Sequence, residues 1–258
     1  MKKPSWVIEK EKSRRAAANA TVWLFGLHAV RDALRNPART RIKLIVTKNA
    51  ADRLSADIAA SGVEPEIADP RKFLAPLDPG SVHQGAALEV RPLDWGAPQD
   101  LLASAGPRSM VLCLDRVTDP HNVGAILRSA EVFGAKAVIA PVRHAAPETG
   151  ALAKSASGAL ERQPYIRVRN LATTLNDLKS MGFLLVGLDG EAGTDIETAA
   201  AEAGDRPLAL VLGAEGPGLR EKTKATCDRL ARIQYSGEFG SLNVSNAAAV
   251  SLYAATRR

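Results

Sequence analysis

Five polar side chains in three short segments of the chain have the chemistry of a catalytic site. The segments are residues 111–128, 208–220 and 233–247, and the side chains are Asn122, Arg128, Glu215, Ser241 and Asn243. Amides, hydroxyls, a carboxylate and a guanidinium can orient a ligand and stabilise charge on it. The elements around these residues must bring them together if they act as one site.

The first segment predicts a buried strand, a turn and a helix. Residues 111–114 are a continuous apolar run, as expected for a strand covered on both faces. An Asp-Pro pair marks the turn, and Asn122 stands where the helix N-terminus needs a polar cap. Ligands of open α/β sheets bind at the carboxyl ends of strands, where this segment places Asn122. Arg128 is six residues further on, and its long side chain can reach the same crevice. The alternative is an ordinary βα unit with solvated polar groups.

The other two segments also follow apolar runs. Residues 208–212 predict a buried strand, and three glycines then surround Glu215. Glycine permits a positive φ and a close approach of the backbone to a ligand. Residues 233–236 predict a short strand, followed by a loop and an alanine-rich helix from Val244. Glycine-rich loops and capped helices are common singly, so the order of all three segments is the specific signal.

The chain divides into a basic first part and a neutral second part. Residues 1–91 contain 16 Lys and Arg and 10 Asp and Glu, which leaves +6, whereas residues 92–258 contain 18 of each. This split suggests that the first part binds a polyanion and the second performs chemistry, the alternative being a merely solvated basic surface. We predict a basic arm (1–20), a small α/β domain (21–91), a linker (92–108) and a catalytic domain (109–258).

Alternating strands and helices predict a mostly parallel sheet covered by helices in the catalytic domain. The predicted strands of the chain are residues 42–47, 86–90, 111–114, 137–140, 165–168, 184–188, 208–212 and 230–233, and the predicted helices are 26–34, 53–61, 99–104, 123–133, 148–154, 171–181 and 244–256. No apolar run is long enough to span a membrane, and residues 1–20 have no apolar segment typical of a secretory signal. Two widely separated cysteines suit a reduced cytoplasm, and the four histidines have no metal-ligand spacing, so we expect a cytoplasmic protein without a metal.

The three segments resemble the SpoU (TrmH-type) branch of the SPOUT methyltransferases, which methylate the ribose 2′-hydroxyl of RNA. The first matches the family's Asn, Gly and Arg motif, the second its Gly-Glu-Gly-Gly-Leu motif and the third its Ser-Leu-Asn-Val-Ser motif. Residues 83–85 (His-Gln-Gly) and 26–34 are similar to the N-terminal substrate-binding domain of the ribosomal-RNA members. Members that form 2′-O-methylguanosine in 23S ribosomal RNA are the most similar.

The resemblance implies a parallel sheet with a C-terminal trefoil knot, S-adenosyl-L-methionine (AdoMet) as the cofactor and a homodimer with the site at its interface. By motif position, backbone groups of Gly213, Ile233 and Leu242 would hold AdoMet. The turn after the strand at 111–114 lacks the glycines of a Rossmann cofactor site, which agrees with this placement. Arg128 would stabilise the developing alkoxide, within its own subunit or across the interface.

The other site residues have roles that follow from their chemistry within that resemblance. Asn122 and Asn243 would orient loops and the ribose, and Glu215 would fix Arg128 or the glycine-rich loop by charge-assisted hydrogen bonds. Glu215 as the general base is the alternative. The function so implied is AdoMet-dependent 2′-O-methylation of ribosomal RNA. The competing interpretations are a transfer-RNA 2′-O-methyltransferase and a catalytically silent RNA-binding protein of the same fold.

Overall fold

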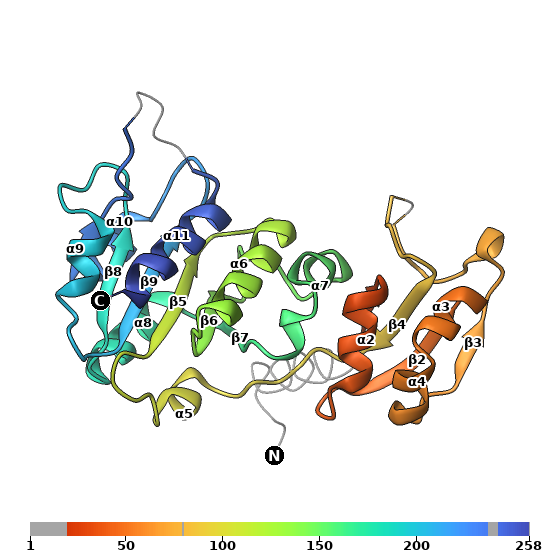
Figure 1. The fold of residues 1–258 in the computed structure, drawn as a ribbon. Helices are drawn as coiled ribbons and strands as arrows, with labels where there is room; N and C mark the ends of the chain where they lie inside the picture. Colours follow the sequence, from red (N-terminus) through yellow and green to blue (C-terminus); the bar gives the residue numbers. More distant parts are fainter. Residues whose placement is uncertain (1–19, 79, 237–241, 258) are drawn as a thin grey trace, which may run out of the picture. The chain divides into compact units, whose positions relative to one another are not determined.

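A computed structural model describes residues 20–78, 80–236 and 242–257, and the chain forms two compact units (Figure 1). The first unit contains residues up to Leu93 together with Glu148–Lys154. The second contains Asp94–Pro147 and Ser155–Arg258. In the part of the chain that is described, no helix is both long and apolar enough to cross a membrane.

A four-stranded sheet forms the first unit, in the order β1-β4-β2-β3. Strand β4 is antiparallel to both β1 and β2, whereas β2 and β3 are parallel. Buried apolar side chains of β1, β2 and β4 form the core of this unit, and helix α2 packs on β1 and β4. The elements are β1 (Val22–Phe25), α2 (Leu27–Arg35), β2 (Arg41–Val46), α3 (Lys48–Arg53), α4 (Ser55–Ser61), β3 (Pro65–Ile67) and β4 (Ala86–Val90).

The His83-Gln84-Gly85 segment, which precedes β4, links this sheet to the start of helix α2. The Gln84 side-chain oxygen accepts a hydrogen bond from the Leu27 amide at the start of α2, at 3.1 Å. Gly85 has a φ of 78°, and a Cβ there would lie 2.4 Å from the hydroxyl oxygen of Thr47. A side chain at position 85 would therefore collide with Thr47, the residue that follows β2.

A short segment from the middle of the chain completes the first unit. Glu148 pairs with the buried guanidinium of Arg39 at 2.5 Å, and Arg39 also donates to the Arg91 carbonyl. Gly150 begins helix α7 (Gly150–Ala156), and a Cβ there would lie 2.3 Å from the Trp23 carbonyl oxygen. The sequence places this segment in the catalytic domain, whereas the structure packs residues 148–154 with the first unit.

The second unit is built on a six-stranded parallel sheet, in the order β10-β8-β9-β5-β6-β7. Helices α6, α9 and α11 pack together on one face, and α5, α8 and α10 cover the other (Figure 1). The strands are β5 (Met110–Asp115), β6 (Ala137–Pro141), β7 (Tyr165–Val168), β8 (Leu184–Leu188), β9 (Leu208–Gly213) and β10 (Arg229–Ala231). The remaining helices are α5 (Pro98–Leu102), α6 (Pro120–Val132), α8 (Leu171–Ser180), α9 (Ile196–Ala201), α10 (Glu221–Thr226) and α11 (Val244–Thr256).

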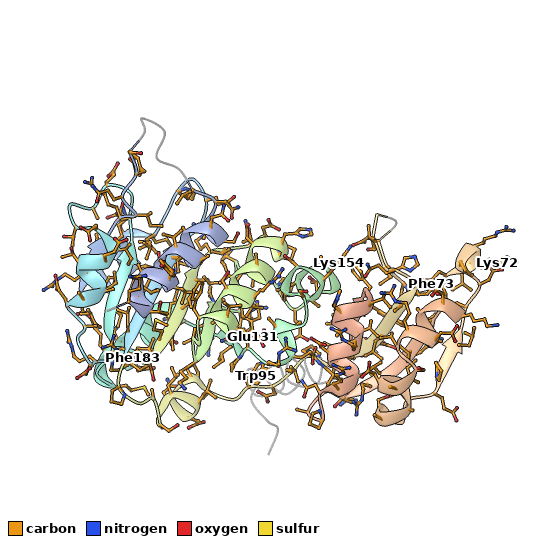
Figure 2. The ribbon with its side chains drawn as sticks, in the orientation of Figure 1. Lys72, Phe73, Trp95, Glu131, Lys154 and Phe183 are labelled. Carbon is orange, nitrogen blue, oxygen red and sulfur yellow. The ribbon has the colours of Figure 1, made fainter. Side chains whose placement is uncertain are left out.

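Apolar side chains fill the layer between this sheet and α8. The α8 leucines at 171, 175 and 178 belong to one core cluster with buried side chains of β5, β8 and β9. Phe183 is buried in this core, and Trp95 packs against it partly buried (Figure 2). Burial of both faces explains why β5 and β9 are apolar along nearly their whole length.

The predicted parallel sheet covered by helices is confirmed, with local differences from the expected elements. The helix expected over 53–61 is two helices that meet at Leu54, and the strand expected over 230–233 ends at Ala231. Strands β1 and β3 and helices α9 and α10 were not expected, because segments of three to six residues are too short to show a period. Helix α11 returns across the sheet to pack on α6 and α9. The trefoil knot stays a prediction.

Candidate active site

The carboxyl ends of β5 and β9 bring the first two motif segments together. The two strands are paired in register from Met110 and Leu208 to Asp115 and Gly213. A Cβ on Gly213 would lie 2.1 Å from the Gly218 carbonyl carbon and 2.3 Å from the Leu219 amide nitrogen. Only glycine therefore lets the glycine-rich loop fold back onto the end of β9.

Glu215 is the centre of a hydrogen-bonded cluster that joins the three motif segments. Its Oε1 accepts from Asn243 Nδ2 at 2.6 Å and from Asn122 Nδ2 at 3.1 Å. Asn243 Nδ2 also donates to Asn122 Oδ1 at 2.9 Å. The Val244 amide, at the start of α11, donates to the same Glu215 oxygen at 3.3 Å. The positive end of a helix next to a carboxylate stabilises its charge.

Asn122 does not cap helix α6, contrary to the expectation from the sequence. The cap is Asp119, whose side chain accepts from the His121 amide at 2.9 Å, and Pro120 is the first helical residue. Proline suits that position because it has no amide hydrogen and its φ is fixed near the helical value. Asn122 is thereby free in the first turn to bind Glu215 and Asn243.

Asn243 combines two roles at the start of α11. Its Oδ1 accepts from the Ser245 amide at 2.9 Å and so caps the helix, while its Nδ2 binds Glu215 and Asn122. The capping hydrogen bond holds the Asn243 side chain in one orientation, and this orientation also fixes the direction of its Nδ2. The third motif therefore forms the helix and part of the site at once.

A pocket of about 770 Å³ opens beside this cluster, at the carboxyl ends of β8, β9 and β10. Gly213, Ile233 and Leu242 all line it, as does Glu215. No hydrogen bond between described residues uses the backbone groups of Ile233 or Leu242. Unpaired backbone donors and acceptors of fixed geometry in a concave site are suited to recognising a heterocyclic base.

Two carboxylates give the pocket a negative side. Besides Glu215, Asp189 lines it, and the Lys224 ammonium lies 2.7 Å from Asp189. The hydrogen bond from Lys224, together with that from the Glu191 amide, lowers the pKa of Asp189 below its usual value. Asp189 is thus held ionised, its charge is paired with that of Lys224, and Arg232 also lines the pocket, so Glu215 is the lining carboxylate without an ion pair among the described residues.

Arg128 is not part of the Glu215 cluster in one subunit. It lies exposed on α6, and no described residue accepts a hydrogen bond from it or pairs with it. Among the described residues no hydrogen bond or ion pair joins Glu215 to Arg128, and Oε1 of Glu215 accepts instead from the two asparagines and the Val244 amide. An interaction of Glu215 with Arg128 stays a prediction. Ser241 lies outside the described residues.

Asp115 is a buried residue of the site that the sequence analysis did not assign. It is fully buried at the end of β5, where it accepts from Arg220 Nε at 2.8 Å and from the Thr223 hydroxyl at 2.7 Å. The contact anchors the far end of the glycine-rich loop and the start of α10. A charged residue that ends an apolar strand is the signal that could have found it.

The chain matches two family models. The SpoU rRNA Methylase family matches residues 109–253, and RNA 2′-O ribose methyltransferase substrate binding matches residues 23–95. A 23S rRNA (guanosine-2′-O-)-methyltransferase RlmB of Ralstonia nicotianae is 41% identical over 241 residues, which are 91% of this chain and 95% of that protein. The RlmB of Photobacterium profundum is 39% identical over 241 residues, 91% of this chain and 97% of that protein.

Solved structures agree with this assignment at the level of the fold. The SpoU methyltransferase AviRb from Streptomyces viridochromogenes, in complex with AdoMet, has a TM-score of 0.76 at 24% identity, over 95% of this chain and 92% of that one. A putative RNA methyltransferase of the TrmH family from Porphyromonas gingivalis has a TM-score of 0.72 at 25% identity, over 92% and 90%. With the three motifs joined through Glu215 and the family matched over more than half of its length, the chain belongs to the SpoU rRNA methylase family.

Proposed function

We propose that the chain is an AdoMet-dependent methyltransferase that forms 2′-O-methylguanosine in 23S ribosomal RNA. The observation that carries the proposal is the Glu215 cluster, which joins all three family motifs beside a pocket of cofactor size. Relatives with the RlmB name are about 40% identical over more than nine-tenths of the chain, and they share both units. Bacterial ribosomal RNA is cytoplasmic, so we assign the protein to the cytoplasm.

The residues around the pocket fit AdoMet. Backbone groups of Gly213, Ile233 and Leu242 would hold the adenosine, and Glu215, which also lines the pocket, would offer a carboxylate to its positive charges. AdoMet supplies an electrophilic methyl group on a positively charged sulfur. The protein must then hold the ribose oxygen in line with that methyl group and stabilise the charge that develops on the oxygen.

The cluster performs the positioning part of this work. Asn122 and Asn243 are held by each other and by Glu215. Asn243 uses its whole amide on Glu215, Asn122 and Ser245, so Asn122, which keeps one N–H and one acceptor position in a fixed direction, is the amide that would contact a bound ribose. Because three donors converge on Glu215 Oε1, we assign Glu215 to holding the glycine-rich loop rather than to proton transfer. Arg128 would stabilise the alkoxide electrostatically, since a guanidinium stays protonated.

Among the described residues Arg128 has no hydrogen bond or ion pair with the Glu215 cluster, and the α6–α11 face is suited to the association of two copies of the chain. Val132 is 72% exposed and lies one turn after Arg128 on α6, while Val250 and Tyr253 on α11 are 39% and 51% exposed. Apolar side chains exposed together on two packed helices are typical of a subunit interface. We propose a homodimer through this face, with Arg128 acting across it.

Methyl transfer to defined RNAs tests the function. Purified protein with radiolabelled AdoMet should methylate a 23S ribosomal RNA transcript, and nuclease digestion should place the label on the 2′-oxygen of guanosine. A labelled transfer-RNA transcript with unlabelled ribosomal RNA would identify a transfer-RNA enzyme instead. No label in either RNA, together with no AdoMet binding by calorimetry, would identify a silent RNA-binding protein.

The basic arm should contribute RNA affinity without affecting the cofactor. Residues 1–20 contain six Lys and Arg and two Glu, so they carry +4 of the chain's net charge of +6. Deleting them should weaken binding of 23S RNA and reduce the salt dependence by about 0.7–0.9 for each cation that contacts a phosphate. Filter binding across a salt series measures this, and calorimetry should show unchanged AdoMet affinity.

A variant that keeps the arm but replaces its six basic residues with glutamine separates charge from length. The same loss in both variants supports an electrostatic role. Unchanged RNA binding after the deletion contradicts it. The arm is a better target than residues 1–91, because the first unit also contains Glu148–Lys154 and cannot be removed by one cut.

A further inference from the structure

The second unit has another pocket, of about 760 Å³, on the opposite side of β5 from the proposed AdoMet pocket. It lies at the carboxyl ends of β5, β6 and β7 and next to the first residues of α5 and α8. Five arginines and a histidine line it, against one carboxylate, that of Asp177. The basic residues are Arg116, Arg143, His144, Arg167, Arg169 and Arg220.

Three of these arginines are not neutralised by the protein. Arg116, Arg143 and Arg169 are exposed, and none of them bonds or pairs with a residue in the described ranges. Arg220 is paired with buried Asp115 at 2.7 Å, and Asp177 accepts from the Gln99 side chain at 2.7 Å. Converging guanidinium groups without acidic partners repel one another and attract an anion.

The remaining arginine, Arg167, holds one wall of the pocket in place by hydrogen bonds to backbone carbonyls. Arg167 donates to the carbonyl of Pro141 at the end of β6, at 3.3 Å, and to two carbonyls of the loop that follows, those of Val142 at 2.5 Å and Ala146 at 3.2 Å. Arg143 and His144 belong to this loop, so Arg167 fixes the backbone that presents them. Its own charge is shared among carbonyl oxygens and not with a carboxylate.

Two side chains of the pocket stand on an unfavourable backbone. Arg116 has a φ of 65° and His144 a φ of 59°, a left-handed region that costs a residue other than glycine about 1–2 kcal/mol. Arg116 directly follows β5, and His144 lies three residues after the end of β6. Glycine at either position would avoid this conformational cost. The same conformation occurs at Arg108 outside the pocket, where φ is 60°, so it fixes the position of these side chains without by itself marking a site.

The glycine-rich loop connects this pocket to the proposed methyl-transfer site. Gly213 lines the AdoMet pocket and packs directly against the backbone of Gly218 and Leu219, and the next residue, Arg220, lines the arginine pocket. An anion in the arginine pocket is therefore next to the loop that carries Glu215. The free arginines come from three different strand ends, a spread that suits a chain of phosphates better than one small anion.

We propose that the arginine pocket binds the phosphodiester backbone of the RNA strand that carries the target ribose. The inference rests on the proposed function for the identity of the RNA, and on the geometry of the pocket for the contact itself. Phosphate contacts of this kind fix the register of a nucleic acid and carry no sequence information. The pocket would position the strand, while the Glu215 cluster orients one ribose of it.

A pair of matched charge reversals tests this proposal. Arg143→Glu with Arg169→Glu changes the pocket, and Arg108→Glu with Lys136→Glu makes the same change of charge at the amino ends of β5 and β6. All four side chains are exposed, and none bonds to another described side chain, so both variants should fold. AdoMet calorimetry and thermal denaturation on the full-length proteins check that they do.

The RNA used is a 23S ribosomal RNA transcript, with binding measured by filter retention between 50 and 300 mM salt, roughly the range where phosphate contacts dominate. The pocket variant should bind at least about 10-fold more weakly at low salt, and its salt slope should fall by about 1.4–1.8 for two lost contacts. The control variant should change the slope much less. Equal losses in both variants, or no loss in the pocket variant, would overturn the proposal.

Methylation by the wild-type protein is measured separately, so the two failures are distinguishable. If wild-type protein binds the transcript but does not methylate it, the proposed function fails, and the difference between the two charge variants still reports on the pocket. If wild-type protein methylates the transcript and the two variants bind alike, the function stands and the pocket assignment fails.

Discussion

Replacing Arg128 with alanine is expected to slow single-turnover methylation by about 10²–10³-fold, the usual cost of losing a preorganised oxyanion contact. AdoMet affinity should change little, because Arg128 lies outside the pocket lined by Gly213, Ile233 and Leu242. Arg128→Lys should not restore the rate, since an ammonium cannot reproduce the planar two-pronged geometry of a guanidinium. Rapid-quench kinetics and calorimetry on the three proteins measure both quantities.

Mixed dimers show whether Arg128 acts across the subunit interface. An Arg128→Ala subunit keeps Glu215, and a Glu215→Ala subunit keeps Arg128. If the two residues of one site come from different subunits, mixing the inactive proteins should recover about one quarter of the wild-type rate, because half of the dimers are mixed and each has one complete site. No recovery, from variants that exchange subunits, would place Arg128 in the same subunit. Near-normal turnover of the lysine variant would reject the geometric role.

Gly213→Ala is expected to damage both the cofactor pocket and the stability of the second unit. The new methyl group would lie 2.1 Å from the Gly218 carbonyl carbon, so the glycine-rich loop must move away from β9. Overpacking of this kind costs about 1–3 kcal/mol, which corresponds to about 5- to 150-fold in an affinity. We expect weaker AdoMet binding by calorimetry and a lower melting temperature.

Gly193→Ala is the matched control for this substitution. Gly193 lies outside the pocket, has no heavy atom within 4 Å of a Cβ and does not have a positive φ. Alanine there should leave AdoMet affinity and melting temperature near their wild-type values. A Gly213→Ala protein that matched this control in both measurements would show that the loop does not need its contact with β9.

Most strands and the longer helices of the second unit were predictable because local chemistry determines them. The apolar run of β5 and the alanine-rich run of α11 are signals within a few residues, whereas the cap of α6 was expected at Asn122 and is Asp119. The meeting of the motifs was not predictable from such signals. Asn122 is 93 residues from Glu215 and 121 from Asn243, and strand order alone brings them together. Only the family resemblance linked them in advance.

The arginine pocket and the exposed position of Arg128 had no signal in the sequence for a related reason. Arg116, Arg143 and Arg169 follow three different strands, and each resembles an ordinary solvated cation in its own segment. Their convergence depends on β5, β6 and β7 being parallel neighbours. Helical geometry already placed Arg128 on another side of its helix from Asn122, and the expectation that its long side chain reaches the same crevice stays a prediction.

The path of the chain through the first unit sets an order of events during protein synthesis. The ribosome finishes residues 20–93 some 55 residues before it makes Glu148. At bacterial elongation rates that interval is about 3–11 s, and during it Arg39 lacks the carboxylate that it contacts in the finished unit. The nascent first unit therefore cannot form this ion pair until Glu148–Lys154, which are encoded within the methylase half, have been synthesised. The first unit is completed only while the second is being made.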